Sequence, residues 1–293
     1  AIVELALPVD SLRAVDADVE LRIDSVNLGD GAAFAPLLAR VLIDDGRLKA
    51  EPVQLGGAAG QILSVSGMVD AAQAAWALRV EAKGFDLEEM FKRFGQPGVV
   101  TGGRTELALQ LQGRGRTLQA LLGSLDGTAR VQVGPLHLRN VAINFDRGIV
   151  TRAIGLANPF QKTDPNTDFE CVAVRVPIKN GVLTSDQGIA AETAKYNVVL
   201  NGSVNLRTEA IDVAVTPIVK GGFGVGSASI AGIVRVSGTL GAPVLGVDAA
   251  GAAKLAVNAG VAVMATPWWL ADAVLKKARS NPSPCATALA IQK

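Results

Sequence analysis

Apolar and polar residues alternate along much of this chain. In residues 15–23 the odd positions are apolar and the even positions are acidic or basic. The same two-residue period recurs in shorter runs at 106–112, 131–133, 211–216 and 234–236. Side chains of a strand point alternately to opposite faces, so this pattern is typical of a sheet with one apolar and one polar face. It predicts a mainly β protein built on an antiparallel sheet of many strands.

Turn signals separate the predicted strands. Four pairs of aspartate or asparagine with a following glycine favour tight hairpin turns: Asp45-Gly46, Asp126-Gly127, Asn180-Gly181 and Asn201-Gly202.

Helices are expected to be few. Asp86 can cap a short helix over 87–93, and Thr117 can cap one over 118–122 that Gly123 ends. Further helices are expected over 144–156, 249–264 and 268–278. The strands therefore come first, interleaved with short helices, and a helical segment ends the chain.

The composition bears on what covers the apolar face of the predicted sheet. Hydrophobic residues make up 49% of the 293 residues, but aromatic residues only 4%. A second layer of protein ordinarily covers such a face, and large aromatics usually fill the space between layers. A curved sheet lined by small aliphatic side chains could instead leave room for an acyl chain. At about 0.8 kcal/mol per buried methylene, a chain of about sixteen carbons gains on the order of 12 kcal/mol.

Charge and rare residues exclude several function classes. The 28 basic and 27 acidic residues leave no excess to neutralise phosphates, so we expect no nucleic-acid partner. His137 is the single histidine, and it stands between two leucines with no second ligand or catalytic partner nearby in sequence. We therefore expect a plain strand residue there, and no catalytic residue, metal site or cofactor. The run Gly221–Gly226 lacks the ending of a phosphate-binding loop and indicates a flexible connection.

The most apolar stretch of the chain is Leu255–Ala271. It has no formal charge, but it is short and is interrupted by Pro267. Because a spanning helix needs about twenty apolar residues, this stretch favours a buried or interface-lying helix pair over a transmembrane span. The pair Trp268-Trp269 could lie at a lipid interface or close the end of a groove.

Short motifs follow one another in a fixed order through the second half of the chain. They are Phe169-Glu170-Cys171, Ile178 to Leu183, Asn197 to Leu206, Thr208 to Val213, Val236 to Leu240 with Pro243, Thr266-Pro267 and Asn281 to Cys285. Similar pieces occur earlier, at Asp45 to Leu48, Gly102 to Leu111 and Ser124 to Thr128. In this order and spacing the chain resembles the AsmA family, specifically its C-terminal region.

The resemblance implies a location and a function. AsmA-like proteins are Gram-negative envelope proteins, anchored in the inner membrane by an N-terminal helix and otherwise periplasmic. They are similar to bridge-like lipid transfer proteins, in which a long curled sheet forms an apolar groove, and are implicated in carrying phospholipid towards the outer membrane. The chain begins at Ala1 without a signal-type core, so we expect the anchor to be absent from it. Residues 1–145 would carry the N-terminal part of the curved sheet, and 146–293 the AsmA-like C-terminal region.

Cys171 and Cys285 are the only cysteines. The periplasm that the resemblance implies is oxidising, so a disulfide is their expected state. It would hold the helical C-terminus against the sheet. Two buried free thiols, or one reactive thiol, are the alternatives.

These observations combine into one functional hypothesis. A long, curved antiparallel sheet, with short helices and a helical C-terminal segment, would bind phospholipid or other acyl lipids in an apolar groove. Its further candidate partners are a membrane surface and envelope proteins. The groove candidates are apolar members of the alternating runs, although which face of each strand lines the groove is open: Val19, Leu21, Leu107, Leu109, Val213 and Val215. The alternative is a scaffold of outer-membrane assembly that holds no lipid; a hydrolase is disfavoured.

Overall fold

The computed structural model describes ten stretches of the chain. They are residues 5–24, 26–27, 33–34, 37–56, 62–93, 95–139, 166–194, 196–220, 234–247 and 283–290.

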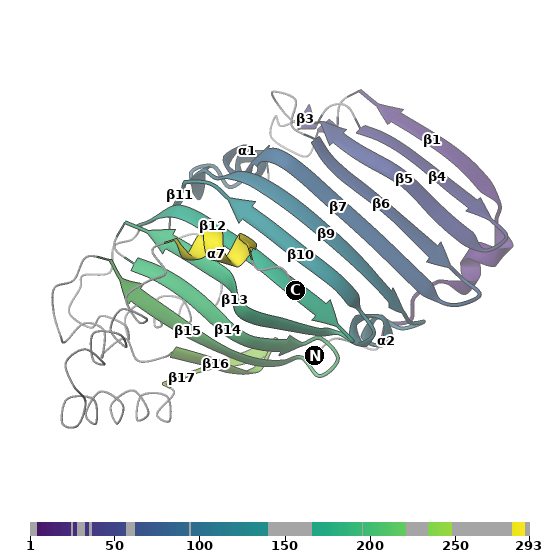
Figure 1. The fold of residues 1–293 in the computed structure, drawn as a ribbon. Helices are drawn as coiled ribbons and strands as arrows, with labels where there is room; N and C mark the ends of the chain where they lie inside the picture. Colours follow the sequence, from purple (N-terminus) through teal and green to yellow (C-terminus); the bar gives the residue numbers. More distant parts are fainter. Residues whose placement is uncertain are drawn as a thin grey trace, which may run out of the picture.

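One large antiparallel sheet of fifteen strands dominates the described residues. Figure 1 shows its strands side by side, in the order β1 (Ala17–Ile23), β4 (Leu37–Asp44), β5 (Arg47–Gly56), β6 (Ile62–Asp70), β7 (Ala75–Asp86), β9 (Arg104–Arg114), β10 (Asp126–Val133), β12 (Asn166–Lys179), β13 (Val182–Thr193), β14 (Tyr196–Asn205), β15 (Ala210–Val219), β16 (Val234–Thr239) and β17 (Ala242–Val247). Strand β11 (Leu136–Arg139) pairs with β12 and with β8 (Val100–Gly102). Strands β2 (Val26–Asn27) and β3 (Ala33–Phe34) form a separate pair. The sheet is not closed, and the prediction of a mainly β, antiparallel fold is confirmed.

The helices are short. Asp86 accepts backbone N–H groups of the first turn of α1 (Leu87–Arg93), and Thr117 caps α2 (Leu118–Gly123), so both predicted helices are confirmed. A 3₁₀ turn, η1 (Asp10–Ala14), precedes β1, and α7 (Pro284–Ala290) lies near the C-terminus. None of the helices in these stretches is both long and apolar enough to cross a membrane.

Several predictions fall outside the described residues. These are the helices over 144–156, 249–264 and 268–278, the division at residue 145, the run Gly221–Gly226, and the apolar stretch Leu255–Ala271 with its tryptophan pair.

Two of the four predicted turns are wrong. Asp45-Gly46 and Asn180-Gly181 do turn between paired strands, with positive φ at all four residues. Gly127 and Gly202, however, lie inside β10 and β14. A β-carbon at Gly127 would overlap the carbonyl oxygen of Gln110 across the strand pair, and one at Gly202 would overlap that of Asp212. Glycine serves at both places as a site of close backbone approach within the sheet.

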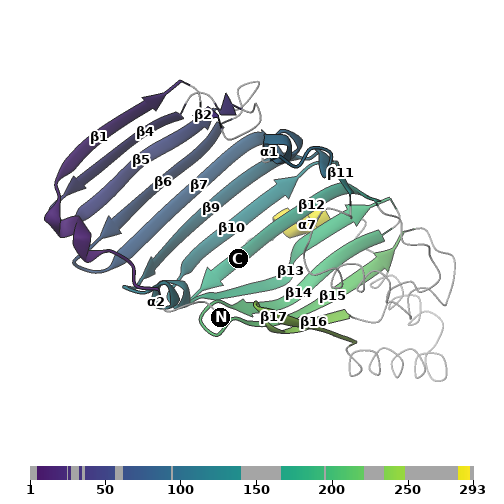
Figure 2. The ribbon, with the colours of Figure 1, turned by 180° about the vertical axis from the view of Figure 1, so that it is seen from behind.

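The sheet is curved. In Figure 1, α7 lies in front of β12 and β13, while β16 and β17 lie behind the neighbouring strands. Seen from behind in Figure 2, β16 and β17 come to the front. The end of the sheet thus bends away from the face that carries α7.

Candidate functional site

The strand register aligns apolar residues in rows that cross the whole sheet. One row contains one residue from each of thirteen consecutive strands: Val19, Val41, Ala50, Gly67, Leu78, Leu111, Gly127, Ile178, Leu183, Val204, Ile211, Gly238 and Pro243. A second row runs from β6 to β15: Leu63, Ala82, Leu107, Val131, Val174, Ile189, Leu200 and Val215. We call the side of the sheet that carries these rows the apolar face, and the opposite side the polar face.

All six groove candidates lie on the apolar face. Val19 belongs to the first row, and Leu107 and Val215 belong to the second. The other three stand at positions of the same parity as row members in their own strands: Leu21 in β1, Leu109 in β9 and Val213 in β15. The structure therefore brings residues nearly 200 positions apart in sequence onto one surface, and it answers which face the alternating runs share.

Ion pairs connect charged side chains of neighbouring strands on the polar face. The guanidinium of Arg40 on β4 donates two hydrogen bonds to the carboxylate of Asp18 on β1, at 3.1 and 2.9 Å. Arg235 on β16 likewise donates two hydrogen bonds to the carboxylate of Asp212 on β15, both at 2.6 Å. These hydrogen bonds hold the pKa of each carboxyl below its usual value. Charge is thereby confined to one side at both ends of the sheet.

Short elements pack on the apolar face where the strands end. Val9 of the N-terminal segment packs with Leu12 against Val69 and Trp76 on β6 and β7. Near the same strand ends, a β-carbon at Gly113 of β9 would meet the side chain of Leu121 in α2. These contacts form a margin along one side of the apolar face.

The α1 helix packs near the other strand ends. A β-carbon at Gly103, just before β9, would lie 3.2 Å from the β-carbon of Leu87 in α1. The carboxylate of Glu88 in the same helix accepts the backbone N–H of Gly102 at 2.7 Å.

The apolar face is accessible at some of the described strands and covered at others. Val19 and Leu21 on the edge strand β1 are 53% and 44% exposed, and Leu78 on β7 is 40% exposed. Ala82 of the second row and Ile178 of the first row are buried. Thirteen strands have twelve gaps of about 4.8 Å, so the first row extends over about 58 Å. Side chains of this kind in the core of a domain would be almost completely buried.

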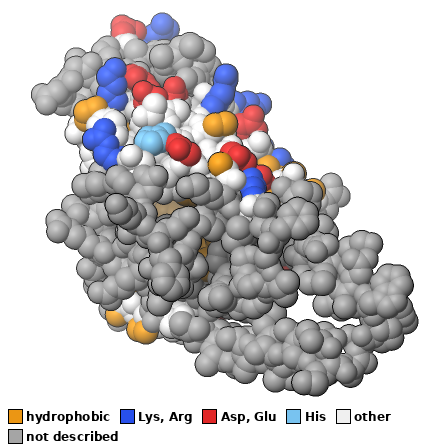
Figure 3. Space-filling model, turned by 90° about the vertical axis from the view of Figure 1, so that its left-hand side faces the viewer, with side chains coloured by type: hydrophobic (Ala, Val, Ile, Leu, Met, Phe, Trp, Pro, Cys, Tyr) orange, Lys and Arg blue, Asp and Glu red, His pale blue; other side chains and the backbone are white. Residues whose placement is uncertain are grey.

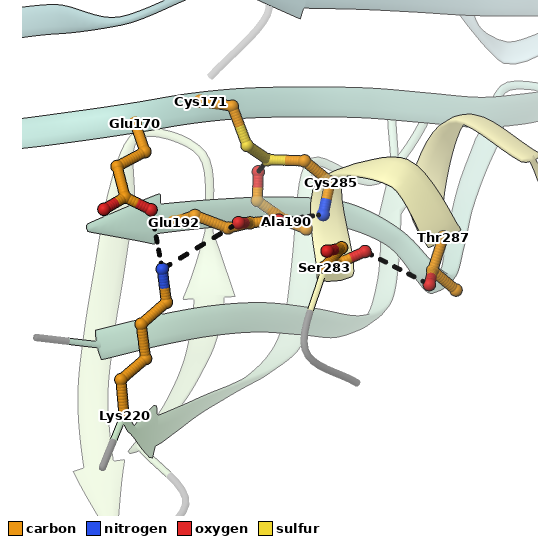
Figure 4. The surroundings of a disulfide bond; sticks show 8 residues. All are labelled: Glu170, Cys171, Ala190, Glu192, Lys220, Ser283, Cys285 and Thr287. Carbon is orange, nitrogen blue, oxygen red and sulfur yellow. Dashed lines mark hydrogen bonds and ion pairs between the residues drawn. A yellow bond between two sulfur atoms is a disulfide. The ribbon is translucent and has the colours of Figure 1, made fainter. Parts of the chain in front are cut away.

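The helix α7 is fastened to the polar face, as Figure 4 shows for its N-terminal end. A disulfide joins Cys171 of β12 to Cys285 of α7, with the two α-carbons 6.6 Å apart, which confirms the predicted bond. Ala288 packs with Ala173 and Ala190 in a small buried cluster. By the register these two sheet alanines belong to the polar face, since Ala173 lies opposite Gln132.

Charged side chains hold both ends of α7. The carboxylate of Glu192 accepts the N–H of Cys285 at 2.9 Å, and Arg175 donates to the carbonyl oxygen of Leu289 at 2.8 Å. An acid at the N-terminus and a base at the C-terminus both favour the helix dipole. Lys220 in turn contacts Glu170 at 2.7 Å and Glu192 at 3.9 Å. Sequence reasoning missed Glu192 and Arg175, because each lies about a hundred residues from its partner in α7.

The Sγ atoms of both cysteines and the Glu192 carboxylate lie within 4.8 Å of one another. The two sulfurs are bonded to each other, whereas metal binding requires thiolates. In this oxidised state the cluster fastens the helix and does not supply a metal site.

His137 lies in β11, as predicted. The single histidine is at the surface in Figure 3, next to an acidic side chain. Its Nδ1 faces the carboxylate of Asp168, the residue opposite it on β12. Sequence reasoning missed Asp168 because the partner comes from a neighbouring strand, 31 residues away.

The comparisons with known proteins give one result. The model of the AsmA family matches residues 7–187, a stretch that runs from the N-terminal segment through β1 into β13. It includes the motifs at 45–48, 102–111 and 124–128. Searches of curated proteins and of solved structures found no match.

Proposed function

This chain belongs to the AsmA family, and on that basis we propose that it binds the acyl chains of phospholipids on its apolar face and passes them along the sheet. We place it in the periplasm of a Gram-negative bacterium, at the inner membrane, with transport directed towards the outer membrane. The proposal involves no chemical reaction and no cofactor.

One observation carries the proposal: the first apolar row continues across thirteen strands. A storage site for a single lipid needs only a pocket, whereas a row of about 58 Å exceeds the length of one acyl chain. Valine, leucine, isoleucine and alanine offer dispersion and burial but no directional bonds. A lipid would therefore have nearly equal free energy at successive positions, which is what movement along the sheet requires. Selection among headgroups would be weak for the same reason.

A pair of neighbouring residues allows a direct test. Leu109 and Gln110 are consecutive in β9 and point to opposite faces. A photoreactive phenylalanine analogue replaces each in turn in the full chain, and the protein is irradiated during expression in bacteria. Lipid extraction and mass spectrometry then identify covalently attached phospholipid.

We expect lipid adducts at position 109 and none above background at position 110. Equal labelling at both positions would indicate adventitious contact with membranes. An absence of adducts at 109, with no lipid seen by native mass spectrometry of the unmodified protein, would contradict the proposal and favour the scaffold alternative.

A further inference from the structure

The polar face carries an open trough of about 800 Å³. The trough crosses six neighbouring strands, β5, β6, β7, β9, β10 and β12. Two rows of polar-face residues line it, one with Ser66, Arg79, Gln110 and Thr128 and the other with Met68, Ala77, Gln112 and Asp126. Residues of the first apolar row, such as Gly67 and Gly127, complete the lining between them. Because polar-face residues lie along both sides, the trough lies on the side of the sheet opposite to the proposed lipid path.

Basic residues outnumber acidic residues in the lining of the trough. Its lining includes three basic residues, Lys49, Arg79 and Lys179, and one acidic residue, Asp126. The carboxylate of Asp126 already accepts the backbone N–H of Asn180 at 2.9 Å. Lys179 is exposed and forms no ion pair with any acid in the described stretches. Arg79 is paired with Glu81, and Lys49 lies 3.8 Å from Glu51, so Lys179 is the cation most available to a partner.

Exposed apolar side chains lie at the end of the trough near β4 and β6. Met68 lines it and is 53% exposed. Leu42 on β4 pairs with Lys49, which pairs with Met68, and Leu42 is 39% exposed. An apolar contact site therefore adjoins the basic one on the same face.

We propose that this trough binds an extended acidic segment of a partner polypeptide. Five strand spacings of about 4.8 Å give a path of about 24 Å, which matches roughly seven extended residues. Carboxylates of the segment would pair with Lys179, Lys49 and Arg79, while Gln110, Gln112 and Thr128 can hydrogen-bond its backbone. An apolar side chain of the segment would pack on Met68. The trough runs between two rows of polar-face residues, and this narrow shape suits a single polypeptide strand better than a bilayer surface.

The test uses the full chain and a fluorescein-labelled octapeptide of alternating glutamate and serine or leucine, with fluorescence anisotropy as the readout. The control peptide has lysine in place of every glutamate. We expect the acidic peptide alone to bind, and its affinity to fall as salt rises from 50 to 500 mM. The double variant Arg79→Glu/Lys179→Glu should bind it roughly tenfold more weakly, since each reversal replaces an attraction by a repulsion.

Arg22→Glu is the matched control, because Arg22 is a highly exposed base on the polar face outside the trough. It should leave the affinity unchanged. If reversal at Arg79 and Lys179 disturbs folding by circular dichroism, Lys179→Gln replaces the pair, and a roughly threefold loss is expected. Equal binding of both peptides, or an equal loss in Arg22→Glu, overturns the proposal. A third result would also overturn it: the protein binds vesicles with anionic headgroups, the trough variant weakens that binding, and the acidic peptide does not bind. That result would assign the trough to a membrane surface. Because the trough and the apolar face are on opposite sides, failure here leaves lipid adducts at position 109 unaffected.

Discussion

A charge placed in the middle of the apolar face should interrupt lipid movement. Val131 is suited to this test because it lies in the second apolar row on β10, between Leu107 of β9 and Val174 of β12. Aspartate has a size similar to valine, so the substitution adds a charge to the row with little change in volume. Its neighbour Gln132 points to the polar face and is exposed, so Gln132→Asp is the matched control.

The magnitude follows from the strand spacing. An acyl chain that crosses one strand over about 4.8 Å places about four methylenes against it. At about 0.8 kcal/mol each, the contact is worth about 3 kcal/mol. Because the aspartate carboxylate stays hydrated, methylenes cannot pack against it, and the variant should lose most of the free energy of this lipid contact. A loss of about 3 kcal/mol lowers occupancy at that position roughly a hundredfold.

Two measurements separate a path from an isolated site. The first is the stoichiometry of bound fatty acid, from native mass spectrometry; the second is the rate at which the protein moves a fluorescent phospholipid between vesicles. In Val131→Asp we expect bound lipid to fall only in part, because the rows on either side remain, whereas transfer should fall by at least tenfold. Val131→Ala, which removes methyl groups but adds no charge, should retain most of the transfer.

A folded Val131→Asp protein that transfers lipid at the rate of Gln132→Asp would refute the reasoning. A strand substitution of this kind costs on the order of 1 kcal/mol of stability, so thermal unfolding of both variants must accompany the assay.

The disulfide, one sheet glycine and the surface ion pairs provide three further predictions. Cys171→Ser should lower the free energy of unfolding by about 4 to 5 kcal/mol in the chain-entropy model, because the disulfide spans 114 residues; urea denaturation measures this, and an unchanged midpoint would contradict it. Gly202→Ala should cost about 1–3 kcal/mol, because its φ is +144° and its β-carbon would overlap a carbonyl oxygen, whereas Gly246→Ala, with nothing within 4 Å of its β-carbon, should be nearly neutral in the same denaturation assay. The pKa of Asp18 is lowered in the folded state by its hydrogen bonds to Arg40, so the stabilisation is fully present above the ordinary value of 3.8 and is lost as pH falls below it; acid titration of Asp18→Asn against the parent should show the two stabilities converging below that pH.

Alternation along the chain predicted the class of fold and the apolar membership of each strand, but it could not establish that the strands share one face. Between Ala50 and Val53 on β5 the register shifts at a β-bulge. Both residues pair with members of the apolar face although they are three positions apart, Ala50 with Gly67 and Val53 with Val65. A strict period of two would place them on opposite faces. The bulge restores the phase, and such irregularities have no reliable signature in one sequence.

The groups around α7 could not be predicted for a different reason. Cysteine pairing was predictable because only one pair was possible. Glu192 and Arg175 are ordinary charged strand residues, and their roles arise only when β12 and β13 lie beneath the helix. Asp168 beside His137 is a similar case. Local patterns predict elements well, whereas contacts between distant segments depend on register and topology.

The placement of α7 bears on the function more than its size suggests. The buried cluster between the helix and the sheet contains three alanines, Ala173, Ala190 and Ala288, besides Cys285, and these small side chains give little hydrophobic stabilisation. A seven-residue helix is also marginal by itself. A covalent bond and two charged contacts therefore secure an element that would otherwise dock weakly, and they secure it on the polar face. Had the same helix packed on the opposite side of β12 and β13, it would have covered Val174 and Ile189 and broken the second apolar row. The disulfide thus fastens α7 on the face where the helix leaves the apolar rows continuous. Stability alone does not require this placement, whereas the proposed path for acyl chains does.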